Sequence, residues 1–228
     1  MPRVVVTHWV HEEVAGYDNF DAGACTRRGI WLTIVPTTII PPTAELAVGL
    51  VIGVMRRVGE GDRAIRSGGF SGWRPELYGS GLAGATVGIL GLRELVAASG
   101  VIVAALPLEP GTRGLLDAAT LALAPPGAFV VNVGRGSVVD EEAVADALDE
   151  GRLGGYAADV FAMEDWAVPG RPAGIPGRLL RHPRTLFTPH LGSAVDDVRR
   201  EMSLQAARQV RQVLAGQRPE HAVNEVPG

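Results

Sequence analysis

The 228-residue sequence contains no lysine, and all 21 of its Lys and Arg positions are arginine. A Schiff-base enzyme needs a lysine amine, and the phosphate-binding P-loop also carries an essential lysine. Pyridoxal-phosphate chemistry and P-loop phosphoryl transfer are therefore poorly supported.

Cysteine is almost absent as well, since Cys25 is the only one. A single cysteine cannot form an intramolecular disulfide, so we expect a reducing compartment and a cytoplasmic protein. The five histidines are scattered, and neither His-x-x-x-His nor Cys-x-x-Cys occurs. We therefore expect no metal site.

Long apolar runs and an excess of positive charge are also lacking. The longest charge-free apolar run, at 46–55, is far shorter than the roughly 20 residues that a membrane span needs. We expect no signal peptide at the beginning of the chain. The net charge of −4 argues against nucleic acid or an anionic membrane as the main partner.

From residue 86 onward, apolar segments of strand length alternate with amphipathic helical segments. Such alternation predicts an α/β fold with a doubly wound parallel sheet covered on both faces. Upstream, we expect strands at 3–7 and 29–35, and a buried helix from 42 to 57 or 66. Downstream, the expected strands are 86–90, 101–106, 128–133, 156–161 and 185–188, and the expected helices are 92–99, 115–123, 141–150 and 195–214.

A Gly-x-Gly-x-x-Gly pattern occurs at 79–84, but it precedes a strand. The dinucleotide-binding fingerprint follows a strand and opens a helix, so 79–84 is interpreted as a loop. The strand at 86–90 does carry Gly88 and Gly91, yet the further glycines and the ribose-binding acid do not follow. Only ten residues, 91–100, separate this strand from the next, fewer than a parallel crossover usually needs.

Three polar side chains, Arg135, Glu164 and His190, come just after three successive expected strands. Ligands of open α/β sheets bind at the carboxyl ends of the strands, where these groups would converge. An arginine suits an anionic substrate group and a histidine suits proton transfer. A carboxylate can fix the tautomer of the histidine and raise its pKa. Spacing alone leaves Asp159 and Asp165 open as alternatives to Glu164, and a capping arginine and a structural histidine are the non-catalytic alternatives.

Three motifs resemble those of the D-isomer-specific 2-hydroxyacid dehydrogenases. They are Asn-Val-Gly-Arg-Gly-Ser-Val-Val-Asp at 132–140, Gly-Gly-Tyr-Ala-Ala-Asp-Val-Phe at 154–161, and Thr-Pro-His-Leu-Gly-Ser at 188–193. Within this family, segments 161–166, 72–79 and 16–21 are most similar to the phosphonate (phosphite) dehydrogenases.

The resemblance implies a Rossmann-like NAD-binding domain at 42–191, and a remnant of a flavodoxin-like substrate domain at 1–41 and 192–228. It implies hydride transfer to NAD, with NADP left open, and oxidation of phosphite to phosphate. The alternatives are a dehydrogenase or reductase of a small D-2-hydroxy acid such as glycerate, lactate or glyoxylate, and a non-catalytic remnant. A homodimer that uses the helix at 42–57 and the loop around Trp73 is also implied.

The same resemblance assigns roles to individual residues. Arg135 would hold the small anionic substrate, His190 would be the general base, and Glu164 would orient His190. Trp73, Tyr78 and Arg199 are substrate candidates, with surface packing or a solvated helix face as the alternative. The cofactor candidates are Gly88, Gly91, Leu106, Pro107, Asn132, Val133, Gly134, Asp159 and Gly192.

The chain departs from the family pattern in three places. After Val14 it lacks most of the first part of the substrate domain. After Gly91 it lacks the rest of the glycine motif, its helix and the acid-bearing strand. Ala15 stands where the family carries an active-site lysine.

Overall fold

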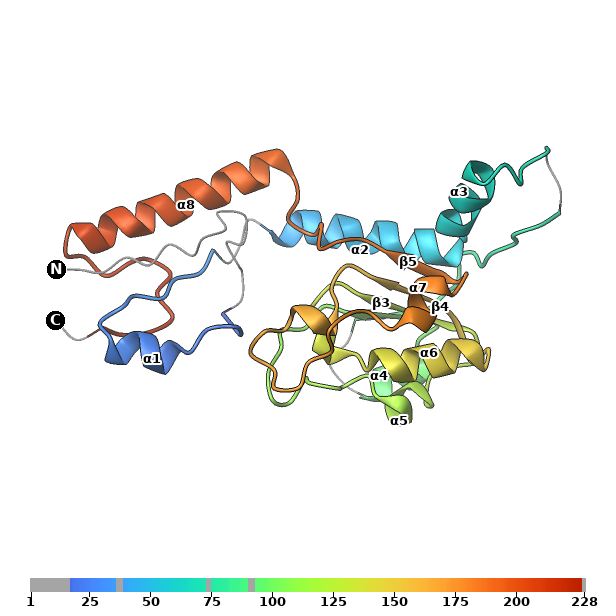
Figure 1. The fold of residues 1–228 in the computed structure, drawn as a ribbon, viewed down its shortest axis with the longest axis horizontal. Helices are drawn as coiled ribbons and strands as arrows, with labels where there is room; N and C mark the ends of the chain where they lie inside the picture. Colours follow the sequence, from blue (N-terminus) through green and yellow to red (C-terminus); the bar gives the residue numbers. More distant parts are fainter. Residues whose placement is uncertain (1–16, 36–38, 73–74, 90–92, 227–228) are drawn as a thin grey trace. The chain divides into compact units, whose positions relative to one another are not determined.

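The computed structural model describes residues 17–35, 39–72, 75–89 and 93–226 (Figure 1). The chain divides into two compact units. One comprises Met1–Thr43 and Gly192–Gly228, and the other comprises Ala44–Leu191. The assignment of these units to a substrate domain and a cofactor domain stays a prediction.

The described part of the second unit contains a five-stranded, entirely parallel sheet with the order β1-β2-β3-β4-β5. Ala104 pairs with Asn132, Asn132 with Ala158, and Ala158 with Phe187. The carboxyl ends of β2 to β5 therefore lie side by side at one edge of the sheet. The strands are β1 Val87–Ile89, β2 Val101–Ala104, β3 Ala128–Asn132, β4 Leu153–Ala158 and β5 Thr185–Phe187.

Helices cover both faces of this sheet. Each strand pairs with the next one in the sequence, so every crossover moves along the sheet in the same direction. Because such crossovers are right-handed, the connecting helices lie on one face (Figure 1). These helices are α4 Arg93–Ala98, α5 Ala118–Leu121, α6 Glu141–Asp149 and α7 Gly177–Arg181. On the other face, α2 (Ile40–Met55) packs Leu50, Val51, Val54 and Met55 against Val101, Val103, Phe129, Val131 and Ala157.

The α/β class with a parallel sheet is confirmed, but the strand order never reverses in the described residues. An order reversal is where doubly wound sheets form their ligand crevice. The short β1–β2 connection nevertheless makes a parallel pair, with Val87 opposite Val101. Gly88 permits this, because a side chain at this position would overlap the Ser99 hydroxyl just after α4.

Several expected boundaries were wrong. No strand forms over 29–35, where Ile30 and Thr33 are isolated bridge residues and Thr33 pairs with Ala222. β4 begins at Leu153, earlier than expected, because Gly154 and Gly155 interrupt the apolar pattern in the sequence. In the sheet, Gly155 pairs with Phe129, and the register shifts at Gly154. Of the two expected ends of the helix that starts at 42, the one near 57 is close to the end of α2, whereas the extension to 66 is broken at Arg57. Arg57 has a φ of 56° and separates α2 from α3 (Val58–Arg66). The expected strand at 3–7 lies outside the described residues.

Asn224 is a buried polar anchor of the first unit. Its amide oxygen accepts a hydrogen bond from the Leu32 backbone, and its amide nitrogen donates to the Thr26 hydroxyl and the Ile30 carbonyl. These bonds attach the C-terminal segment to α1 (Ala22–Arg27) and to the chain that follows it. The unit also contains α8 (Asp196–Leu214). No helix among the described residues is long and apolar enough to cross a membrane.

Candidate active site

The side chains of His190 and Glu164 are joined at the carboxyl edge of the sheet. The Nδ1 atom of His190 lies 2.7 Å from Oε2 of Glu164. The second carboxylate oxygen, Oε1, accepts a 2.7 Å hydrogen bond from the Phe161 backbone N–H. Because a carboxylate only accepts, Nδ1 carries the hydrogen and Nε2 is the nitrogen left to exchange a proton.

Asp159 fixes the backbone of His190. The His190 N–H donates to the Asp159 carbonyl at 2.9 Å, and the Leu191 N–H donates to Asp159 Oδ1 at 2.7 Å. The Thr188 hydroxyl donates to the same oxygen. His190 itself has a φ of 57°, a left-handed conformation that non-glycine residues adopt only when their surroundings impose it. The buried carboxylate of Asp159 therefore orients the turn that presents His190.

Arg135 follows β3 and begins a turn that Asn132 organises. The fully buried Asn132 side chain donates from Nδ2 to the Arg135 carbonyl and accepts from the Gly134 N–H, at 3.0 and 3.1 Å. The half-buried guanidinium of Arg135 donates to the Gly134 carbonyl at 3.0 Å. Arg135 is thus held just after β3, and the neighbouring strand β4 leads to Glu164.

The pKa of His190 is raised above its ordinary value. The hydrogen bond to Glu164 is the main cause, and the negative charges of Glu164 and Asp159 add to it. Burial and the positive charge of Arg135 act in the opposite direction. His190 therefore keeps its proton to a higher pH than a free imidazole would.

The structure distinguishes the three acids that spacing left open. Glu164 contacts His190, as the resemblance implied. Asp159 lies beneath the His190 turn. Asp165 points elsewhere, because its buried carboxylate accepts a 2.7 Å hydrogen bond from the Ser137 N–H.

Glu141 is a buried acid near the site that the sequence did not reveal. Its neighbour Asp140 caps α6 as expected, by accepting from the backbone of Glu142 and Ala143. Glu141 instead turns inward and accepts from the Ala162 N–H at 2.8 Å. Burial raises its pKa to about 7. A run of three acids at a helix start gives no signal of which one faces inward.

The cofactor candidates fall into separate groups. Leu106 and Pro107 follow β2, and Val133 and Gly134 follow β3. These two loops touch, since a side chain at Gly134 would lie 2.5 Å from the Leu106 carbonyl oxygen. Gly88 lies in the middle of β1, where it packs against α4, and not at the strand end.

The remaining site candidates are Gly91, Trp73, Tyr78, Gly192 and Arg199. Gly91 and Trp73 lie outside the described residues, and Gly192 and Arg199 belong to the other unit. There Arg199 donates to the Ser193 hydroxyl at 3.0 Å. Tyr78 is exposed beside Arg57. Within the described residues, no group of three or more His, Cys, Asp or Glu side chains could hold a metal ion.

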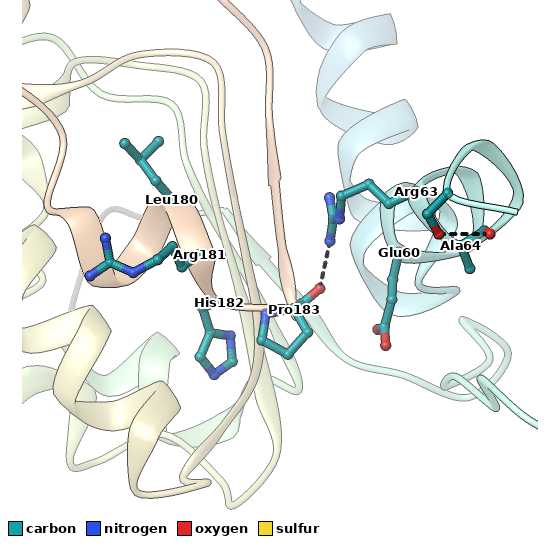
Figure 2. Close-up of a pocket in the computed structure, with 8 residues that line it drawn as sticks. Glu60, Arg63, Ala64, Leu180, Arg181, His182 and Pro183 are labelled. Carbon is teal, nitrogen blue, oxygen red and sulfur yellow. Dashed lines mark hydrogen bonds between the residues drawn. The ribbon is translucent and has the colours of Figure 1, made fainter. Parts of the chain in front are cut away.

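A separate pocket lies between α3 and the chain that connects α7 to β5 (Figure 2). Arg63 crosses it and donates to the Pro183 carbonyl at 3.0 Å. Pro183 precedes β5, whereas His190 follows it. The pocket is therefore at the amino end of the strand, away from His190.

Comparison with known proteins connects this arrangement to one family. Residues 91–192, which contain Arg135, Glu164 and His190, match the NAD binding domain of the D-isomer specific 2-hydroxyacid dehydrogenases. A glycerate dehydrogenase of Hyphomicrobium methylovorum is 32% identical, over 84% of this chain and 70% of its own length. A glyoxylate reductase of Thermofilum pendens is 30% identical, over 92% of this chain and 73% of its own length.

A solved structure agrees with the sequence matches. The putative D-isomer specific 2-hydroxyacid dehydrogenase of Polaromonas has a TM-score of 0.81 and 28% identity, over 92% of this chain and 76% of that one. Because it is 30% and 32% identical to these two relatives over more than two thirds of their length, this chain belongs to the D-isomer specific 2-hydroxyacid dehydrogenase family.

Proposed function

We propose that this chain is an NAD-dependent oxidoreductase that interconverts a small D-2-hydroxy acid and its 2-oxo acid. The observation that carries the proposal is the 2.7 Å contact between His190 Nδ1 and Glu164 Oε2. This pair lies at the carboxyl edge of the sheet, where Arg135 follows the neighbouring strand β3. A proton-transfer group and a cation for the substrate carboxylate are two of the elements this chemistry needs.

In this proposal Arg135 binds the substrate carboxylate through its guanidinium. During oxidation, His190 Nε2 takes the proton of the C2 hydroxyl, and Glu164 stabilises the imidazolium that results. A bound nicotinamide cofactor would supply the hydride chemistry at C2. In the reductive direction the protonated His190 returns its proton to the carbonyl oxygen.

The residues present fit the nicotinamide end of the cofactor. The loops that follow β2 and β3 touch at Leu106 and Gly134, beside the strand end that bears Arg135. The adenosine end has less support, because β1 is paired on only one side in the described residues. NAD and NADP therefore both remain in the proposal.

A 2-hydroxy acid is favoured over phosphite as the substrate. Segments 161–166, 72–79 and 16–21 suggested the phosphite dehydrogenases, but the comparisons do not support that assignment. Two of the relatives are a glyoxylate reductase and a glycerate dehydrogenase by name. We therefore adopt the alternative substrate class, with glyoxylate and glycerate as first candidates.

A second candidate is a non-catalytic family member that binds the cofactor weakly or not at all. The absence of a strand-order reversal in the described residues favours it, because that reversal forms the crevice of doubly wound folds. Ala15, which stands in the place of the family's lysine, favours it too.

Titration calorimetry with NAD and NADP separates the two candidates. If no heat of binding is measured at millimolar cofactor, the proposal that the chain is an enzyme is excluded. If binding occurs, initial rates with glyoxylate, D-glycerate, D-lactate and phosphite identify the substrate class. Turnover of phosphite alone would restore the phosphite assignment.

We also propose a homodimer built on α2. This helix buries one side against the sheet, but Val48 and Ile52 on its other side are 57% and 45% exposed. Apolar side chains exposed one turn apart on a long helix are typical of an interaction face.

A further inference from the structure

Asp165 connects two loops that carry different parts of the candidate active site. It follows Glu164 directly, and its side chain accepts a 2.7 Å hydrogen bond from the Ser137 N–H. Ser137 belongs to the short helix η1 (Gly136–Val138), which begins immediately after Arg135. A single carboxylate thus joins the turn of the anion-binding residue to the turn of the histidine-orienting residue.

This connection is buried and sterically tight. Asp165 is 1% exposed, and a buried carboxylate is unfavourable unless its hydrogen bonds compensate for lost water. The two turns also approach so closely that a side chain at Gly136 would overlap the backbone of Phe161 and Ala162. A small shift of one turn would therefore displace the other.

The Glu164 turn, η2 (Ala162–Glu164), is held on its other sides as well. Glu141 accepts from the Ala162 N–H at 2.8 Å. Arg171 donates to the Met163 carbonyl at 2.5 Å and stacks over the Trp166 ring, 3.9 Å from its centre. These contacts hold η2 against α6 and against the segment that follows it, whereas the Asp165 bond reaches the turn after Arg135.

We infer that Asp165 is a positioning residue that couples Arg135 to the Glu164–His190 pair. It sets the spacing between the group that binds the substrate anion and the group that moves the proton. The kinetic part of this inference rests on the proposed function, but the geometric coupling does not.

The charged groups around His190 and Glu141 determine how loss of the Asp165–Ser137 hydrogen bond would change the pKa of His190. His190 is influenced by Glu164 from η2, Asp159 after β4 and Arg135 after β3. Glu141 of α6 is influenced by Asp165 and Glu164. Without the Asp165 bond we expect η2 to relax and the Glu164–His190 contact to lengthen, so that the pKa of His190 falls toward its ordinary value.

The test compares Asp165→Ala and Asp165→Asn with Asp117→Ala as a matched control. Asp117 also accepts a backbone N–H at 2.7 Å, from Thr120 at the start of α5. NMR titration of the His190 ring in the free protein gives the pKa without any turnover. His190→Gln identifies the resonance among those of the five histidines.

We expect Asp165→Ala to lower the pKa of His190. We expect Asp165→Asn to restore it, because an amide oxygen can still accept from Ser137, and Asp117→Ala to leave it unchanged. Where the protein turns over, Asp165→Ala should also reduce kcat/KM by about tenfold to a hundredfold through both kcat and KM, since misplacement of about 1 Å can lower a rate a hundredfold.

An unchanged His190 pKa in folded Asp165→Ala, or an equal shift in Asp117→Ala, would overturn the inference. If Asp165→Ala does not fold, Asp165→Glu decides, because its longer side chain keeps the charge and changes the spacing. A wild-type pKa in that variant would contradict the coupling. A wild-type chain without any turnover would count against the proposed function only, because the NMR result does not depend on it.

Discussion

Gly136 lies directly against the backbone of Phe161, so that the turn after Arg135 and the turn before Glu164 are in contact without a side chain between them. This backbone contact and the Asp165–Ser137 hydrogen bond together place Arg135 and Glu164, which are far apart in sequence. The packing at position 136 is the most sensitive steric feature of the candidate site.

Gly136→Ala should separate these turns. An overpacked interior typically loses 1–3 kcal/mol, and we expect a loss of about 2–3 kcal/mol in the free energy of unfolding. Chemical denaturation measures this change. The control is Gly61→Ala in α3, which has open space around it and should gain about 0.5–1 kcal/mol from the removal of a helical glycine. Equal stability of Gly136→Ala and wild type would contradict the close approach.

Glu164→Gln should change the pH dependence of the reaction. The reductive direction needs protonated His190, so kcat/KM for glyoxylate should fall as the pH rises through the pKa of His190. Glu164 raises that pKa, so the fall should begin at lower pH in Glu164→Gln. General acid–base catalysis contributes about 10²–10⁴-fold to a rate, which is the upper limit of what Glu164→Gln can lose through His190.

Rate profiles between pH 5 and 9 measure this effect. The control is Glu142→Gln, since Glu142 forms an ion pair with Arg178 on the outer side of α6 and should leave the profile unchanged. A Glu164→Gln profile identical to that of the wild type would rule out the role of Glu164.

Glu141→Gln should alter how stability depends on pH. Burial raises the pKa of Glu141 from 4.5 to about 7, so the folded state binds this proton more tightly than the unfolded state. The stabilisation is fully present below pH 4.5 and is lost as the pH rises through 7. At 1.36 kcal/mol per pKa unit, the loss is roughly 3 kcal/mol.

Urea denaturation at pH 5 and pH 8.5 tests this. Glutamine keeps an acceptor for the Ala162 N–H but cannot ionise. We therefore expect Glu141→Gln to be more stable than the wild type at pH 8.5 and no more stable at pH 5. The same difference between the two proteins at both pH values would refute the raised pKa.

Ile52→Arg should disrupt the proposed homodimer. A charge in the middle of an apolar interface is costly to bury unless it is paired. Sedimentation equilibrium should give a dimer for the wild type and a monomer for Ile52→Arg. Leu123→Arg is the control, because Leu123 is also exposed but follows α5 on the other face of the sheet. A monomeric wild type would remove the proposal.

The sequence was sufficient to predict the α/β class and the family, because both depend on local signals. Apolar strand-length segments predict a parallel sheet, and such a sheet brings Arg135 and the segment after β4 to one edge. His190 follows β5 to the same edge. The boundary errors at Gly154 and Arg57 arose where glycine interrupts the apolar pattern and where one residue turns left-handed.

Tertiary structure alone decided which acid faces which partner. Asp159, Glu164 and Asp165 lie close together in the chain, yet they contact the His190 turn, the His190 ring and Ser137 respectively. Only the folded backbone shows that Glu141 turns inward and that Gly136 has no room for a side chain. Such contacts join residues more than twenty positions apart, and no periodicity along the sequence encodes the direction in which a side chain points once two loops meet.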